Sequence, residues 1–265
     1  MKQPTREKIN EWINTTERLR SRKQKLFNDG YMQLNNLSIE GVFYSFSLYD
    51  KHDAICFALL EDKAQALESL NRSVTNGMIP YQMAFDDNCE FHEIARSPED
   101  NGFIHLPIAH QQALTMAALN NDVLNQSLLP FLLLLEKDLN DGDSMEMVQT
   151  VEALRNILAH GDDAKSEALL KVALDHSKTH PIQGGWRRRT YTINLSLWAI
   201  LRRDQHTFDE ALALNLKDYE QAAKGEVRGT PEAYVSLAAV GLVKLARRYG
   251  LKYDGDNPLI PAALL

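Results

Sequence analysis

Cysteine is scarce in this 265-residue chain, and so are the residues that interrupt helices. The two cysteines exclude a disulfide framework and an all-cysteine zinc site. The 13 glycines and nine prolines are fewer than a globular chain of this length usually contains, so helix breakers are rare. Apolar residues make up 44% of the chain and charged residues 25%, which is ordinary globular composition and excludes a wholly disordered protein.

Long hydrophobic runs are also missing. The most apolar stretch, Leu128–Leu135, is short and contains Pro130, whereas a membrane-spanning helix needs about 20 apolar residues. The first residues, MKQPTREKIN, carry charges with no apolar run behind them, so no secretory signal is expected. We therefore expect a cytoplasmic protein with no membrane partner, in which Cys56 and Cys89 are free thiols.

Basic residues are nearly absent from the middle of the chain. Residues 84–152 contain only Arg96 and Lys137 against 13 carboxylates, although the net charge of the whole chain is only −7. In contrast, residues 1–28 contain eight basic and three acidic side chains. An acidic segment repels nucleic acid and attracts a basic partner, so no direct nucleic-acid binding is expected; a merely solvated surface is the alternative interpretation.

Apolar residues recur at three- and four-residue steps through most of the chain, which predicts an all-α fold of about ten helices. The segments 75–80 and 97–102 contain Pro, Gly or Asn and are expected to be irregular. The aromatic content of residues 42–48 leaves a strand possible there. The predicted helices cover about 9–27, 34–48, 53–74, two segments within 105–139, and then 145–159, 163–178, 186–202, 207–223 and 231–249.

A helix–turn–Asp–helix pattern occurs four times, at Asp62, Asp122, Asp162 and Asp204. An Asp in this position accepts hydrogen bonds from the free N–H groups of the next helix. The last three lie about 40 residues apart, a spacing typical of stacked helical hairpins. We therefore predict an irregular array of antiparallel helical hairpins with the character of a TPR-like solenoid.

The predicted array forms one domain over residues 1–265. Residues 1–104 supply its N-terminal helices, and residues 105–265 form the helical-hairpin array. The residues expected in the core include Leu195, Trp198, Leu212, Leu214, Leu237 and Leu242.

Motifs for nucleotide binding, metal binding and nucleophilic catalysis are missing. The chain has no G-x-x-x-x-G-K-[ST], G-x-G-x-x-G or G-x-S-x-G sequence. His176 and His180 have the spacing of a zinc-binding helix, but no glutamate lies between them and Pro181 follows. We therefore predict no catalytic residue, no metal and no cofactor.

One short motif is compatible with an enzyme. Arg155-Asn156-Ile157-Leu158-Ala159-His160 has the form R-N-x-x-x-H and resembles the signature of HEPN ribonucleases. A guanidinium can hold the scissile phosphate, and an imidazole can assist the attacking 2′-hydroxyl. Side chains five positions apart on one helix point about 140° apart, so the pair converges only if the helix ends near His160 or a second subunit completes the site. Alternatively, residues 160–162 are simply the turn into the next helix.

The C-terminal residues 231–265 read PEAYVSLAAVGLVKLARRYGLKYDGDNPLIPAALL. A helix of small and apolar residues leads into Arg247–Leu251, an acidic turn, Pro258–Pro261 and a leucine-rich end. This stretch resembles the end of the immunity protein 49 family of bacterial polymorphic toxin systems. The helix–turn–Asp–helix elements at 157–170 and 199–214 fit the same family, so the resemblance is best over about 150–265.

The resemblance implies a protein that binds a cognate toxin and blocks it stoichiometrically, without turnover. Many toxin domains of these systems are basic nucleases, so a carboxylate-rich surface would steer the encounter and cover a nucleic-acid groove. The alternatives are a HEPN-like ribonuclease using Arg155 and His160, or a helical-repeat scaffold for an unrelated protein. The residues expected to face the toxin are Asp86, Asp87, Glu90, Glu93, Asp138, Asp141, Asp143 and Glu146.

Overall fold

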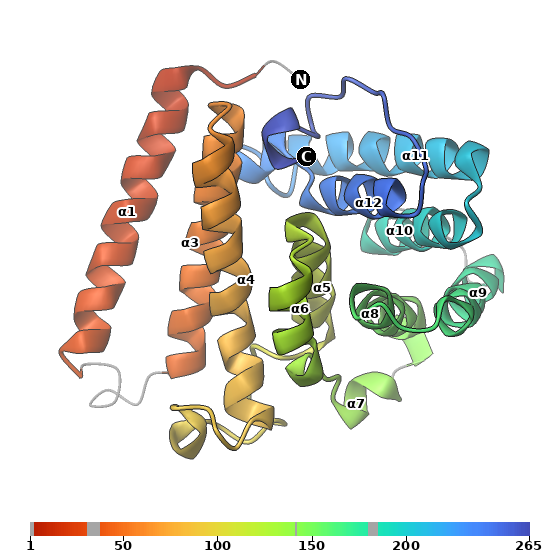
Figure 1. Cartoon of the computed structure of the whole chain (residues 1–265). Helices are drawn as coiled ribbons and strands as arrows, with labels where there is room; N and C mark the ends of the chain where they lie inside the picture. Colours follow the sequence, from red (N-terminus) through yellow and green to blue (C-terminus); the bar gives the residue numbers. More distant parts are fainter. Residues whose placement is uncertain (1–2, 31–37, 141, 180–184) are drawn as a thin grey trace.

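The computed structural model describes residues 3–30, 38–140, 142–179 and 185–265, and the regular structure in these ranges is helical, as predicted (Figure 1). Within them, no helix combines the length and the apolar character needed to cross a bilayer. The α-helices are α1 (Arg6–Asn28), α3 (Ile39–Leu59), α4 (Lys63–Phe85), α5 (Leu106–Leu119), α6 (Asp122–Leu128), α7 (Glu136–Leu139), α8 (Met145–Leu158), α9 (Asp163–Thr179), α10 (Gly185–Arg202), α11 (Gln205–Lys224) and α12 (Leu237–Arg248). Short 3₁₀ turns are η1 (His92–Ile94), η2 (Leu129–Phe131), η3 (Gly142–Ser144), η4 (Pro231–Tyr234) and η5 (Ala262–Leu264).

Helical hairpins dominate the packing. α3 lies against α4, α8 against α9, and α10 against α11, while α1 packs on the outer side of α3 (Figure 1). The array does not remain open, because α12 returns to pack on α5 and η5 contacts both α3 and α4. At the α5–α12 crossing, a Cβ added to Gly241 would lie 3.0 Å from the Ala118 backbone nitrogen, so this glycine permits the close approach.

Four connections between consecutive helices share one backbone conformation. In the described part of the chain, the non-glycine residues with positive φ, between 54° and 63°, are Glu61, Asn120, His160 and Arg203, and each follows the end of a helix. The next residues close the turn: the N–H groups of Asp62 and Asp204 donate to carbonyls five residues earlier, each at 2.9 Å. The hairpin pattern in the sequence therefore corresponds to a repeated local structure.

The predicted aspartate caps are confirmed in three of these four turns. Carboxylates of Asp62, Asp162 and Asp204 accept backbone N–H groups two or three residues later, at 2.8 to 3.1 Å. The cap predicted at Asp122 is wrong. Asn121 caps that helix by accepting from the Leu124 N–H at 3.2 Å, so Asp122 is left for other partners.

Some predicted boundaries are also wrong. The segment 53–74 is not one helix, because α3 continues to Leu59 and the turn at Asp62 separates it from α4. Residues 75–80 are helical, with Pro80 inside α4, because the burial of Met78, Pro80 and Tyr81 outweighs the local preference for a break. The possible strand at 42–48 lies in α3, and residues 34–37 lie outside the described residues.

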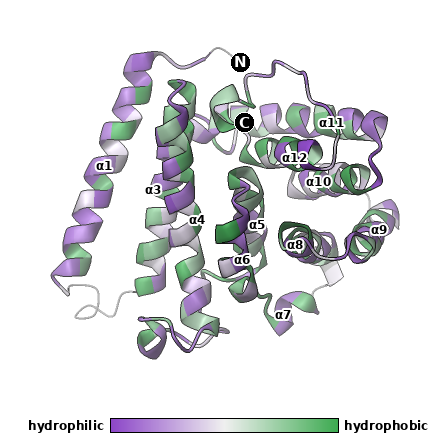
Figure 2. Ribbon diagram, viewed as in Figure 1, coloured by the Kyte–Doolittle hydropathy of each residue, from purple (hydrophilic) through white to green (hydrophobic). Residues whose placement is uncertain are grey.

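One hydrophobic cluster extends from Ala54 in α3 to Leu264 in η5 and includes residues of most helices. Figure 2 shows α5 and α12 as largely hydrophobic, whereas α1 is mostly hydrophilic. Leu212 and Leu242 are buried in this cluster as predicted, and Trp198 and Leu237 pack against it. Leu195 is half-buried. The prediction for Leu214 is wrong, because 39% of this residue is exposed.

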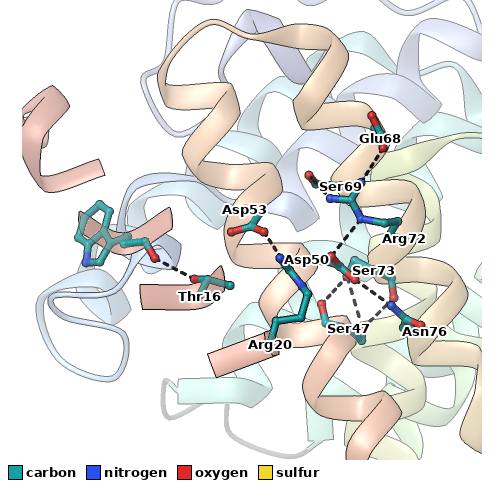
Figure 3. A network of polar contacts seen from close by, with 11 residues as sticks. Thr16, Arg20, Ser47, Asp50, Asp53, Glu68, Ser69, Arg72, Ser73 and Asn76 are labelled. Carbon is teal, nitrogen blue, oxygen red and sulfur yellow. Dashed lines mark hydrogen bonds and ion pairs between the residues drawn. The ribbon is translucent and has the colours of Figure 1, made fainter. Parts of the chain in front are cut away.

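Only Ile9 and Thr16 are buried on α1, so hydrophobic packing contributes little to its attachment. A polar network joins α1 to α3 instead (Figure 3). The Arg20 guanidinium reaches Asp50 at 3.0 Å and Asp53 at 2.5 Å. Asp50, only 2% exposed, also accepts from Arg72 Nε at 3.2 Å and from Asn76 Nδ2 at 2.8 Å, both on α4. The network therefore holds three helices around one carboxylate.

Candidate functional site

The first predicted acidic group lies in the loop that follows α4. Asp87, Glu90 and Glu93 are exposed, and Asp86 is half-buried. The Asp86 carboxylate accepts the backbone N–H of Asn88 at 3.0 Å, which forms a turn at the start of the loop. Three of the four carboxylates are therefore on the surface.

The second group, around α7, lies at the same end of the molecule, at the lower edge of Figure 1. Lys137 Nζ donates to the Glu99 carbonyl at 3.2 Å, which joins α7 to the loop. The Asp138 carboxylate accepts from the Leu106 N–H at 3.2 Å, at the first residue of α5. We call residues 86–100 and 136–140 together the acidic end.

Two apolar side chains of the acidic end are exposed. Ile94 in η1 is 52% exposed and Leu139 in α7 is 53% exposed. Apolar side chains surrounded by polar groups are typical of protein interfaces, where they become buried contacts while the charges form the rim. Neither residue could be predicted from the sequence, because a single isoleucine or leucine carries no signal of surface exposure.

The remaining predicted partner-facing residues differ from expectation. Glu146 is 5% exposed and therefore cannot face a partner, contrary to the prediction. Its carboxylate lies 2.9 Å from His176 Nδ1, on α9. Asp141 lies outside the described residues, and so does the side chain of Asp143.

The R-N-x-x-x-H motif forms part of a hairpin turn. Arg155 Nη1 donates to the Glu152 carboxylate at 2.7 Å, one turn earlier on α8. His160 occupies the left-handed turn position after α8, and its Nε2 lies 3.1 Å from the Asp122 carboxylate of α6. Asn156 Nδ2 donates to the Asp162 carbonyl at 2.6 Å and so holds the turn closed. Arg155, Asn156 and His160 thus each have a structural partner. Arg155 pairs within α8, whereas His160 pairs with α6.

No group of three or more His, Cys, Asp or Glu side chains suitable for a metal ion occurs within residues 3–30, 38–140, 142–179 and 185–265. The His176/His180 spacing, from which no zinc site was predicted, involves His180, which lies outside these ranges. His176 itself contacts Glu146, as described above.

An ion cluster joins α3 to η4. The Glu232 carboxylate lies 2.5 Å from Lys51 Nζ and 3.5 Å from His52 Nε2. Burial alone would raise the pKa of Glu232, but the contacts with His52 and Lys51 outweigh burial and lower that pKa to about 2. The hydroxyl of Tyr219 lies 2.5 Å from the Glu232 carbonyl and fixes η4 on α11.

Low pH should reduce the stability of the fold by protonating Glu232 in this cluster. Because the folded-state pKa of Glu232 is below its ordinary value of 4.5, its stabilisation is complete above pH 4.5 and is lost as pH falls toward about 2. We expect Glu232→Gln to lower the free energy of unfolding by about 2 kcal/mol at pH 7, and the deficit to shrink below pH 4.5. Urea titrations across this pH range would measure it. The exposed pair of Glu210 with His206 supplies the control, Glu210→Gln, for which a comparable deficit would contradict the assignment.

Comparison with known protein families gives a match over the C-terminal part of the chain. The family model described as Immunity protein 49 matches residues 109–264, which begin within α5 and include α6 to α12. No curated protein and no solved structure matches the chain. The matched part contains the three hairpin turns after α5, α8 and α10, and α1, α3 and α4 precede it. Since the match covers more than half of the chain, the protein belongs to the immunity protein 49 family.

Proposed function

We propose that this protein binds a cognate bacterial toxin, a basic effector such as a nuclease, and neutralises it by stoichiometric occlusion. Membership of an immunity protein family supports a toxin partner. The observation that carries the proposal is the acidic end, where the carboxylates of Asp87, Glu90 and Glu93 and the apolar side chains of Ile94 and Leu139 are all exposed.

The acidic end would act in two ways. Its carboxylates attract a basic surface during diffusion and raise the association rate, an effect that salt screens. The apolar side chains lose contact with water in the complex and slow its dissociation. A toxin with a basic nucleic-acid groove would then be covered by a surface that substrate cannot displace easily.

The direct test is complex formation with the product of the neighbouring toxin reading frame. Co-expression should restore growth of cells producing that toxin, and the two proteins should purify together at a 1:1 ratio. Failure to form a complex, with continued toxicity, would contradict the proposed function.

Charge reversal tests the surface. We expect Asp87→Lys/Glu90→Lys/Glu93→Lys to slow association about 10-fold or more at low salt and to reduce the dependence of the rate on ionic strength. Stopped-flow mixing at several salt concentrations would measure both. The matched control, Asp209→Lys/Glu210→Lys/Glu220→Lys, changes net charge equally on the exposed surface of α11. Equal rates for the two triple variants would place the toxin elsewhere.

A further inference from the structure

The loop after α4, which contains exposed carboxylates of the acidic end, packs on two aromatic side chains of other helices. The ring of Phe91 lies 5.2 Å from the ring of Phe43 on α3 and 6.3 Å from the ring of Phe27 on α1, measured between centroids. Phe27 and Phe43 also contact each other edge to face, at 5.8 Å. Aromatic pairs at these separations are attractive beyond the area that they bury. Phe91 therefore attaches the loop to both α1 and α3.

Two hydrogen bonds hold the same loop. The backbone N–H of Arg96 donates to the Glu40 carboxylate at 2.9 Å, and Glu40, in the first turn of α3, is only 1% exposed. His92 Nδ1 lies 2.9 Å from the Met83 carbonyl of α4, and because a carbonyl only accepts, the ring nitrogen donates. Breaking the bond to Glu40 is costly, because it removes a partner from a buried carboxylate. The loop thus has contacts with α1, α3 and α4.

The residues that make these contacts alternate with the exposed residues of the loop. Glu90 precedes Phe91, while Glu93 and Ile94 follow His92, and these three side chains are exposed. Phe91 and His92 themselves are half-buried. Because neighbours in a short segment share one backbone, contacts that fix positions 91 and 92 also restrict where positions 90, 93 and 94 point. A surface that is ordered before binding loses less conformational entropy in a complex.

We propose that Phe91 is a positioning residue for toxin binding: together with Glu40 it holds the loop in its binding conformation before the toxin arrives. This inference rests on the proposed function, since it takes the acidic end as the toxin-facing surface. The loop and its supports on α1, α3 and α4 all precede residues 109–264, which match the family. The part of the chain outside the family match thus determines how these carboxylates are presented.

Hydrogen exchange tests the attachment of the loop without the toxin. We expect Phe91→Ala to speed exchange of the hydrogen-bonded amides of Cys89, His92 and Ala95 about 10-fold or more, while α8 to α12 exchange as in the unmodified protein. The matched control is Phe57→Ala. Phe57 is also half-buried, but it lies near the other end of α3 and packs against the main hydrophobic cluster, so its loss should not change exchange in the loop.

The kinetics of the toxin complex test the positioning role. Phe91→Ala keeps every carboxylate, so the association rate and its dependence on salt should stay within about twofold of those of the unmodified protein. The dissociation rate should rise about 10-fold, because the toxin then has to order the loop on binding. Phe57→Ala should change neither rate. Phe91→Leu keeps an apolar contact and should raise the dissociation rate only about threefold, and it decides the question if Phe91→Ala does not fold.

The inference and the proposed function fail in different ways. An unchanged dissociation rate in folded Phe91→Ala, or unchanged exchange in its loop, would overturn the inference alone. A rise in the dissociation rate that Phe57→Ala reproduces would also overturn it, because loss of stability would then explain the effect. Absence of any complex between the unmodified protein and the toxin would instead contradict the proposed function, and the inference with it.

Discussion

Asp50→Ala is expected to lower the free energy of unfolding by about 3–5 kcal/mol, because it removes the carboxylate on which three helices converge. Asp50 accepts from Arg20, Arg72 and Asn76, and its own side chain is almost completely buried. Its loss would leave two guanidinium groups facing a buried Asp53 and a cavity. Urea unfolding at pH 7, followed by circular dichroism, would measure the change.

Asp175 is a matched control for Asp50. It also accepts from two cations, Lys171 at 2.6 Å and Lys178 at 2.7 Å, but it does so on the exposed surface of α9. Solvent screens such pairs, so Asp175→Ala should leave the unfolding midpoint nearly unchanged. If the two alanine variants lose similar stability, burial of the Asp50 network does not contribute what its geometry implies.

Phe208→Ala is expected to cost about 3–5 kcal/mol, because it leaves a large cavity in the core of the matched family segment. Phe208 is fully buried on α11 and belongs to the main hydrophobic cluster. The same unfolding measurement applies, and the denaturant dependence should stay constant while the midpoint falls.

Leu214→Ala on the same helix is the control for Phe208→Ala. The exposed side chain of Leu214 predicts a change of less than about 0.5 kcal/mol. A large loss of stability for Leu214→Ala would instead mean that Leu214 is a core residue, as expected from the sequence. A small loss for Phe208→Ala would mean that the core around α11 collapses to fill the space.

Features of the fold that depend on neighbouring residues in the chain could be predicted from the sequence. Capping by Asp62, Asp162 and Asp204 depends on residues two or three positions away, so the hairpin turns could be predicted. Leu212 and Leu214 could not both be core residues, because positions two apart on a helix point about 200° apart. The helical period therefore already indicated that Leu212 and Leu214 lie on nearly opposite sides of the helix.

Features that depend on contacts between residues distant in the chain could not be predicted from the sequence. Glu146 was counted among surface carboxylates, yet it is buried, with its carboxylate 2.9 Å from Nδ1 of His176 on another helix. Charge counting identified the acidic residues, but the hydrogen bond from Lys137 to the Glu99 carbonyl, which joins α7 to the loop after α4, had no sequence signal. The pairing of Lys51 with Glu232 had no sequence signal, because the two residues are distant in the chain.

The return of α12 to α5 has a consequence for cooperativity. In an open stack of hairpins each unit touches only its neighbours, so terminal units can melt one at a time. Here α12, the last α-helix, packs against α5, and η5 contacts α3 and α4. Loosening any one hairpin would therefore expose part of the shared hydrophobic core, which favours loss of structure in one concerted transition rather than stepwise fraying.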